Sequence, residues 1–159
     1  LDYANMLNRV LPDDIRVLGW CEVTPDFSAR FSAAWRRYRY LFVRGDLDEA
    51  RMHAAAAHLV GEHDFRNLCK MDVGNVSNFR REVLDAAVGV FSRHPGDPRR
   101  DVLCFEVRGT AFLWHQVRCM VAVLFMVGRG DEDPGVVPRL LDVAAQPGKP
   151  AFLMAPDDG

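Results

Sequence analysis

The sequence predicts an α+β fold in which a mixed or antiparallel sheet carries its helices on one side. Residues 36–43 alternate between basic and mainly aromatic side chains, which is the period of a half-buried strand. Residues 83–91 and 102–108 are typical of two further strands, and residues 94–100, with two Pro and one Gly, connect them. Residues 111–128 are apolar over a length that suits a buried helix.

The start of the chain predicts one helix and one strand. Apolar side chains recur at helical spacing over residues 1–11, and Pro12 ends this helix. Residues 15–23 are predicted to form a strand, and a turn follows at Pro25-Asp26.

The alternation in the basic and aromatic strand assigns its side chains to two faces. Tyr38, Tyr40 and Phe42 fall on one face, and Arg37 and Arg39 fall on the other. Tyr40 is interpreted as a core residue. Taken alone, the pattern favours a half-buried structural aromatic at Tyr38 as well.

The middle of the chain predicts a helix and a loop. Asp46 and Glu49 form a capping-box pattern, and a helix is expected from there to about Val60. Gly61 stands where a glycine ends a helix. Residues 62–81 are polar and aromatic without a regular period, so they are predicted to form an irregular working loop.

The end of the chain predicts two helices and a strand. The long helix is expected to stop at Gly128, and the Gly-Arg-Gly-Asp segment over residues 128–131 is interpreted as the loop that ends it. A second helix is expected over residues 136–145 and a strand over residues 149–155. No repeat or linker interrupts this order.

Length and composition bound the class of protein. With 159 residues, of which 49% are hydrophobic, the chain can bury a core and predicts one domain. Its net charge of −2 gives no overall basic signal for nucleic acid. However, 18 of the 20 basic residues are Arg, whose planar guanidinium suits phosphate. The alternative explanation, the codon bias of a GC-rich gene, stays open.

Cysteine usage and hydropathy exclude several other classes. Cys21, Cys69, Cys104 and Cys119 are scattered without a Cys-x-x-Cys pair, which is typical of a reducing compartment. They lack the ligand spacing of a zinc site, so no metal is expected. The apolar run over residues 112–127 is shorter than the ~20 residues of a membrane span and includes polar side chains, so no membrane is expected.

Arg118 is the most informative single residue, because it stands among apolar side chains. An unpaired buried charge costs several kcal/mol, and no acid lies one turn away on the predicted helix. The partner of Arg118 is therefore expected from another part of the fold, from a ligand, or from sequence outside this chain.

Seven stretches, in the same order, resemble the TruA-type tRNA pseudouridine synthases and look closest to the eukaryotic branch that modifies uridines 38 and 39. They are LPDDI (residues 11–15), DFSARFSA (26–33), RYRY (37–40), GEHDFRN (61–67), CKMD (69–72), AFLWHQVRCM (111–120) and KPAFLMA (149–155). Each is weak alone, but together they cover nearly the whole chain. The stretch at 69–72 indicates the 38/39 branch.

The resemblance implies a partial pseudouridine synthase domain. The family's catalytic aspartate stands in a Gly-Arg-Thr/Ser-Asp motif upstream of the matching region, and this chain has no counterpart. The chain is therefore expected to be the C-terminal portion, residues 1–159, of a longer synthase and to be inactive alone. The resemblance further implies tRNA as partner, a homodimer, no cofactor, and a location in the cytoplasm, the nucleus or both.

The resemblance also implies roles for single residues. Arg118 matches the arginine that pairs with the catalytic aspartate, and Tyr38 matches the tyrosine that stacks on the target uracil. Phe152 or its neighbour Ala151 lies where the family supplies an apolar wall of the substrate pocket. His115 is expected to contact the substrate or a phosphate.

Basic residues near these stretches are candidates for phosphate contacts, although a solvated charged surface would explain many of them. They are Arg36, Arg37, Arg39, Lys70, Arg80 and Arg81. Two alternatives to the enzyme stay open, a non-catalytic RNA-binding module and a structural or dimerisation domain.

Overall fold

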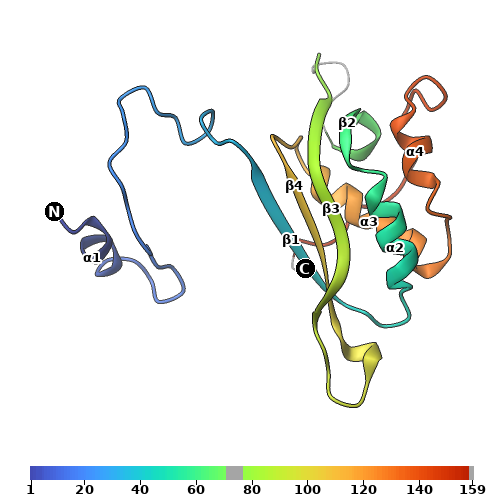
Figure 1. The fold of residues 1–159 in the computed structure, drawn as a ribbon, viewed down its shortest axis with the longest axis horizontal. Helices are drawn as coiled ribbons and strands as arrows, with labels where there is room; N and C mark the ends of the chain where they lie inside the picture. The colour runs from blue at the N-terminus through green and yellow to red at the C-terminus, as the bar shows by residue number, and fades with distance from the viewer. Residues whose placement is uncertain (71–76, 158–159) are drawn as a thin grey trace. The chain divides into compact units, whose positions relative to one another are not determined.

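The computed structural model describes residues 1–70 and 77–157, and the chain divides into two compact units, Leu1–Ala33 and Ala34–Gly159. Residues 71 and 72 of the CKMD stretch lie outside the described residues. Figure 1 shows the course of the chain through both units.

The first unit contains one short helix, α1 (Tyr3–Asn8), which confirms the helix predicted there. The strand predicted over residues 15–23 is wrong, because no strand forms between residues 1 and 33. Instead, the side chain of Asn8 accepts a hydrogen bond from the Val17 amide at 2.7 Å and donates one to the Val17 carbonyl at 2.9 Å. The Asn8 side chain thus satisfies the backbone amide and carbonyl of Val17, as a neighbouring strand would.

The second unit is built on a four-stranded antiparallel sheet with the strand order β1-β4-β3-β2. Its strands are β1 (Arg36–Val43), β2 (Gly61–Asp64), β3 (Arg80–Ser92) and β4 (Val102–Gly109). Short 3₁₀ turns, η1 (Arg66–Leu68) and η2 (Pro98–Arg100), follow β2 and β3. The sheet confirms the strands predicted over residues 36–43, 83–91 and 102–108.

Three helices cover one face of the sheet, as Figure 1 shows, which confirms the predicted α+β class. They are α2 (Glu49–Ala57), α3 (Gln116–Arg129) and α4 (Val136–Leu141). Helix α3 contributes most to the core, where Met120, Val121 and Leu124 are fully buried. It also lies close to α2, since a Cβ added at Gly128 would stand 2.7 Å from the Met52 sulfur.

The two faces of β1 divide as the alternation predicts. Tyr40 is buried, and both Tyr40 and Phe42 pack against the ring of Phe125 in α3. Arg37 and Arg39 lie on the face without helices, where both pair with Glu106 of β4.

The boundaries of α2 differ from the prediction. Asp48, not Asp46, caps the helix, because its carboxylate accepts the amide of Arg51 at 3.0 Å. Asp46 instead pairs with Arg99 at 2.7 Å. Gly61 does not end the helix but begins β2, with a φ of +115° that favours glycine.

The region predicted as a loop over residues 62–81 is partly regular. It contains most of β2, the η1 turn and the start of β3. Strand β2 pairs with β3 from Gly61↔Val83 to Asp64↔Arg80. Four residues are too few for a strand to be recognised by alternation, and Gly-Glu-His-Asp has no large apolar side chain to mark a buried face.

Helix α3 begins at Gln116, five residues later than predicted, and ends at Arg129, after which Gly130 adopts a left-handed φ of 82°. The helix-ending loop predicted over residues 128–131 is therefore confirmed at Gly130 and Asp131, whereas Gly128 and Arg129 still belong to the helix. Helix α4 stops at Leu141, and no strand forms over residues 149–155. That last segment lies against α3 instead, where the Ala155 amide donates to the Arg118 carbonyl at 3.2 Å.

Candidate active site

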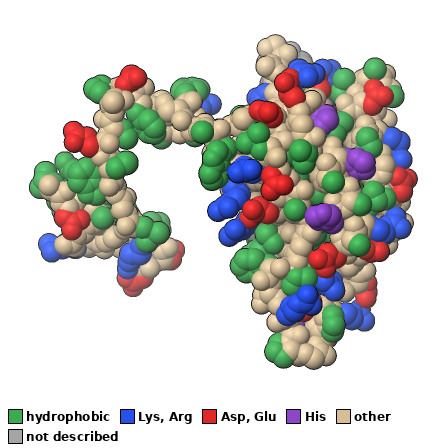
Figure 2. Space-filling view, in the orientation of Figure 1, with side chains coloured by type: hydrophobic (Ala, Val, Ile, Leu, Met, Phe, Trp, Pro, Cys, Tyr) green, Lys and Arg blue, Asp and Glu red, His purple; other side chains and the backbone are tan. Residues whose placement is uncertain are grey.

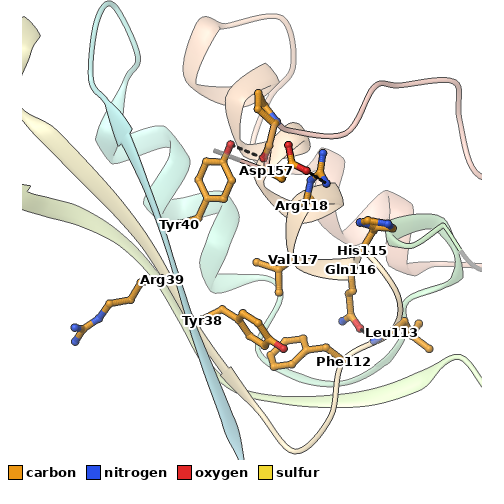
Figure 3. A pocket seen from close by; sticks show the side chains of 11 residues that line it. Tyr38, Arg39, Tyr40, Phe112, Leu113, His115, Gln116, Val117, Arg118 and Asp157 are labelled. Atoms are coloured by element: carbon orange, nitrogen blue, oxygen red, sulfur yellow. Dashed lines mark hydrogen bonds and ion pairs between the residues drawn. The ribbon is translucent and has the colours of Figure 1, made fainter. Parts of the chain in front are cut away.

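A cavity of about 310 Å³ opens between β1, the start of α3 and the end of the chain. Figure 3 shows Tyr38 and Phe112 at one end, Arg118 and Asp157 at the other, and Val117 between them. The walls are mainly apolar, and a few polar groups face one another across the space. This is the usual composition of a small-molecule pocket.

Arg118 reaches the cavity because α3 starts late, which places this residue in the first turn of the helix and not in its middle. The side chain is only 24% exposed. Its Nε donates to the Ala155 carbonyl at 2.7 Å, and its Nη1 lies 3.6 Å from the Asp157 carboxylate. In this chain the partners of Arg118 therefore come from another part of the fold, the C-terminal segment.

Tyr38 forms the opposite end of the cavity. Its ring meets Phe112 edge-on, with 5.2 Å between the centroids and an interplanar angle of 88°. Tyr38 is 46% exposed, so its side chain is neither buried in the core nor fully surrounded by solvent. The ring is thus available to a planar ligand, and Phe112 holds it from one side.

The segment 155–157 closes one side of the cavity, and Tyr40 holds it there. The Tyr40 hydroxyl donates to the Pro156 carbonyl at 3.0 Å. In the preceding residue, Ala155, the amide donates to the Arg118 carbonyl, and the carbonyl accepts a hydrogen bond from the Arg118 Nε. We call residues 155–157 the closing segment. Its three hydrogen bonds fix the guanidinium relative to β1.

The start of α3 is shaped by two unusual residues. His115 has a φ of 56° and is the only non-glycine residue with positive φ among the residues that the structure describes. The Oε1 of Gln116 accepts the Leu113 amide at 2.7 Å. The fully buried Nε2 of Gln116 has no hydrogen-bond partner within residues 1–70 and 77–157.

The structure thus brings Tyr38, His115 and Arg118 to one cavity. Phe152 lies elsewhere: it borders a neighbouring cavity, and the Lys149 ammonium stands 4.6 Å from its ring centroid. Phe112 and Val117 provide the apolar wall instead. The prediction that Phe152 contacts the substrate stays a prediction.

The arginines predicted to bind RNA are largely engaged with protein groups. Arg39 points away from the cavity (Figure 3), and its hydrogen bond to Glu106 holds the pKa of that carboxyl below its ordinary value. Arg80 pairs with Glu62 at 2.6 Å, and Arg36 donates to the Thr110 carbonyl at 2.9 Å. Figure 2 accordingly shows basic and acidic side chains interspersed, without a continuous basic patch on the visible face.

Lys70, Arg80 and Arg81 nevertheless lie at the same end of the sheet as the residues before α3. The Thr110 amide donates to the Glu82 carbonyl of β3, and the Lys70 amide donates to the Trp114 carbonyl. Arg81 donates to the carbonyls of Asn78 and Arg80. Their contact with RNA stays a prediction.

Neither a metal cluster nor a membrane helix is found in the described part of the chain. No three His, Cys, Asp or Glu side chains there are grouped so that they could hold a metal ion. None of the described helices is long and apolar enough to cross a membrane.

Comparison with known proteins agrees with this fold. The sequence profile of the family described as tRNA pseudouridine synthase matches residues 55–159. The Mus musculus tRNA pseudouridine(38/39) synthase is 56% identical, over 96% of this chain and 33% of that protein. The Saccharomyces cerevisiae protein of the same name is 42% identical, over 99% and 34%. The tRNA pseudouridine synthase A of Methanoculleus marisnigri is 38% identical, over 96% and 54%.

The chain therefore belongs to the TruA-type tRNA pseudouridine synthase family. Within that family it falls in the eukaryotic 38/39 branch. It spans about a third of the length of the eukaryotic relatives that it matches.

Proposed function

We propose that this chain is the uridine-holding part of a tRNA pseudouridine synthase that acts on the anticodon stem-loop, at positions 38 and 39. The observation that carries the proposal is the cavity in which Tyr38 and Arg118 face one another across apolar walls. Pseudouridine formation breaks the N-glycosidic bond of uridine, turns the base and rejoins it to the sugar through C5. The cavity receives a uracil that has left the base stack.

The apolar end of the cavity holds the base. Tyr38 stacks on the uracil ring, and its hydroxyl is available to accept or relay a proton near C5. Phe112 supports the Tyr38 ring at 5.2 Å, so its orientation is set before the substrate arrives. Val117 and Phe112 exclude water from the detached base, which keeps it from being lost before it is rejoined.

The polar end of the cavity holds a carboxylate at the sugar. This chain has no Gly-Arg-Thr/Ser-Asp motif, so we assign that carboxylate to an aspartate in another part of the full-length protein. The Arg118 guanidinium keeps such an acid ionised and fixes its orientation. The position of Asp157, 3.6 Å from Arg118 Nη1, supports the proposal that a carboxylate can approach the guanidinium.

The chain alone is expected not to convert uridine, and the full-length protein is expected to work as a homodimer in the cytoplasm, the nucleus or both. The two non-catalytic alternatives gain less support. A pure RNA-binding module would present free basic side chains, whereas Arg37, Arg39 and Arg80 pair with carboxylates.

Arg118→Ala in the full-length protein tests the proposal. We expect pseudouridine at positions 38 and 39 of tRNA to fall by at least about 10²-fold, while tRNA affinity changes little, because Arg118 acts on the catalytic acid. Arg129→Ala is the matched control, since Arg129 ends the same helix and pairs with Asp131. Normal conversion by Arg118→Ala would remove Arg118 from the mechanism.

A further inference from the structure

An aromatic pair stands at the rim of the cavity and has no part in the mechanism above. The Trp114 side chain is 63% exposed, although indole is a large apolar ring. Its ring centroid lies 4.2 Å from that of His115, with an interplanar angle of 53°. Both neighbours of Trp114 in the chain, Leu113 and His115, line the cavity. Figure 3 shows His115 at the edge of the cavity, next to the start of α3.

The loop that carries this pair is fixed by backbone hydrogen bonds. The Trp114 carbonyl accepts the Lys70 amide at 3.2 Å, and the Thr110 amide donates to the Glu82 carbonyl at 3.1 Å. The Leu113 amide is held by Gln116 at 2.7 Å. An exposed aromatic ring on an anchored loop is presented at little further cost in conformational entropy.

The backbone of His115 adds a second sign of function. A left-handed conformation is strained for a non-glycine residue, and glycine would avoid this strain. Strain of this kind persists mainly where surrounding structure enforces it, and it clusters at ligand sites. Here the left-handed turn lies between Trp114 and the first turn of α3, where the chain passes from the rim to Arg118.

A basic residue adjoins the loop that carries the aromatic pair. Lys70 is exposed, and its amide is bonded directly to the Trp114 carbonyl. Exposed aromatic rings next to a basic residue are a usual means of holding an unpaired nucleotide, because a ring stacks on the base and the charge attracts the phosphate.

We propose that Trp114 and His115 form a stacking platform for the nucleobase next to the target uridine, with Lys70 balancing its phosphate. The inference rests on the proposed function, since it requires that a uridine leaves the stack to enter the cavity. Extrusion of that uridine removes a stacking partner from the base beside it. The Trp114 ring replaces this partner at the rim.

A double-mutant cycle between protein and RNA tests the platform in the full-length protein. The RNA is an anticodon stem-loop, either intact or with an abasic site on the 5′ or the 3′ side of the target uridine. We expect one abasic site to weaken binding to the wild-type protein about tenfold. The same abasic site should change binding to Trp114→Ala by less than about twofold, because the stacking partner is already missing.

Two further variants separate stacking from folding. Trp114→Phe keeps an aromatic ring and should retain most of the coupling. Phe91→Ala, an exposed aromatic at the other end of the sheet, should leave the coupling at its wild-type value. Equal effects of both abasic sites on the wild type and on Trp114→Ala would overturn the platform. If pseudouridine still forms in that case, the proposed function stands. A full-length protein that neither binds nor converts the RNA would contradict both the platform and the proposed function.

Discussion

Arg118 is held in one orientation by residues that are distant in the chain. A guanidinium on a long side chain loses rotamer freedom when it is fixed, and its planar fork recognises a carboxylate only if it is aimed correctly. The hydrogen bond from Arg118 Nε to the Ala155 carbonyl fixes one edge of the guanidinium. A second hydrogen bond, from the Ala155 amide to the Arg118 carbonyl, joins the same two residues. The hydroxyl of Tyr40 then fixes the next residue, Pro156.

Tyr40 holds the closing segment through its hydroxyl group and has no assigned role in the proposed reaction. Tyr40→Phe keeps the buried ring but removes the hydrogen bond to Pro156, so we expect a loss of about 1 kcal/mol in the free energy of unfolding. The closing segment should loosen, and amide hydrogen exchange at Ala155 should become faster. In the full-length protein, kcat should fall more than KM rises.

Tyr38→Phe is the matched control for this hydrogen bond. It also removes one hydroxyl from β1, but from a ring that is 46% exposed. Its stability and the exchange rate at Ala155 should therefore equal those of the wild type. If Tyr40→Phe leaves exchange at Ala155 unchanged, the hydroxyl of Tyr40 does not hold the closing segment.

At the scale of elements, the pattern of side chains predicts a strand only where a partner is present. Residues 36–43 and 102–108 alternate clearly, and they pair with each other over their whole length. Residues 15–23 have similar apolar spacing but no neighbouring strand within the unit, and Asn8 takes the backbone of Val17 instead. Strand hydrogen bonds need a second chain segment, and a local pattern does not report whether one exists.

Prediction of the site is limited in the same way, because contacts with distant parts of the chain leave no local pattern. Tyr38, His115 and Arg118 could be chosen as candidates because the seven stretches are specific as a set, and the structure places all three at one cavity. The role of Tyr40 could not be predicted, because its partner, Pro156, stands 116 residues further on. The wall formed by Phe112 depends on the late start of α3, which is set by the left-handed turn at His115.

The junction of β2 and η1 yields a prediction about pH. Asp64 accepts hydrogen bonds from the side chain and the amide of Arg66, and these bonds hold the pKa of Asp64 below its ordinary value. A carboxyl whose pKa is lowered by folding stabilises the protein above its unfolded pKa, about 3.9. That contribution is lost as the pH falls through the folded pKa. Asp64→Asn should therefore cost about 2 kcal/mol at neutral pH and progressively less in acid.

Urea unfolding of the chain at several pH values measures this effect. Asp46→Asn is the control, because Asp46 also pairs with an arginine but its side chain is 82% exposed. Surface pairs of this kind contribute little to stability, so the control should unfold like the wild type. A difference between Asp64→Asn and the wild type that stays constant down to acid pH would show that the pair does not titrate as described.

At the scale of the whole molecule, the buried core belongs to one of the two units. Every member of the core cluster lies between Tyr40 and Ala155, and it joins the sheet, all three helices of the second unit and the closing segment. Residues 1–33 contribute none of these side chains. Since burial of apolar surface is the main source of stability, residues 34–159 should fold without the first unit.

A chain of residues 34–159 tests this directly by thermal unfolding. We expect one cooperative transition with a midpoint within about 4 °C of that of residues 1–159, a shift that corresponds to less than about 1 kcal/mol. The circular dichroism of the sheet and helices should be unchanged. A larger fall, or a broad transition, would mean that the first unit supplies stability that its lack of core residues does not reveal. The site would then depend on residues 1–33 as well, because the closing segment and α3 are fixed only while the core around them is intact.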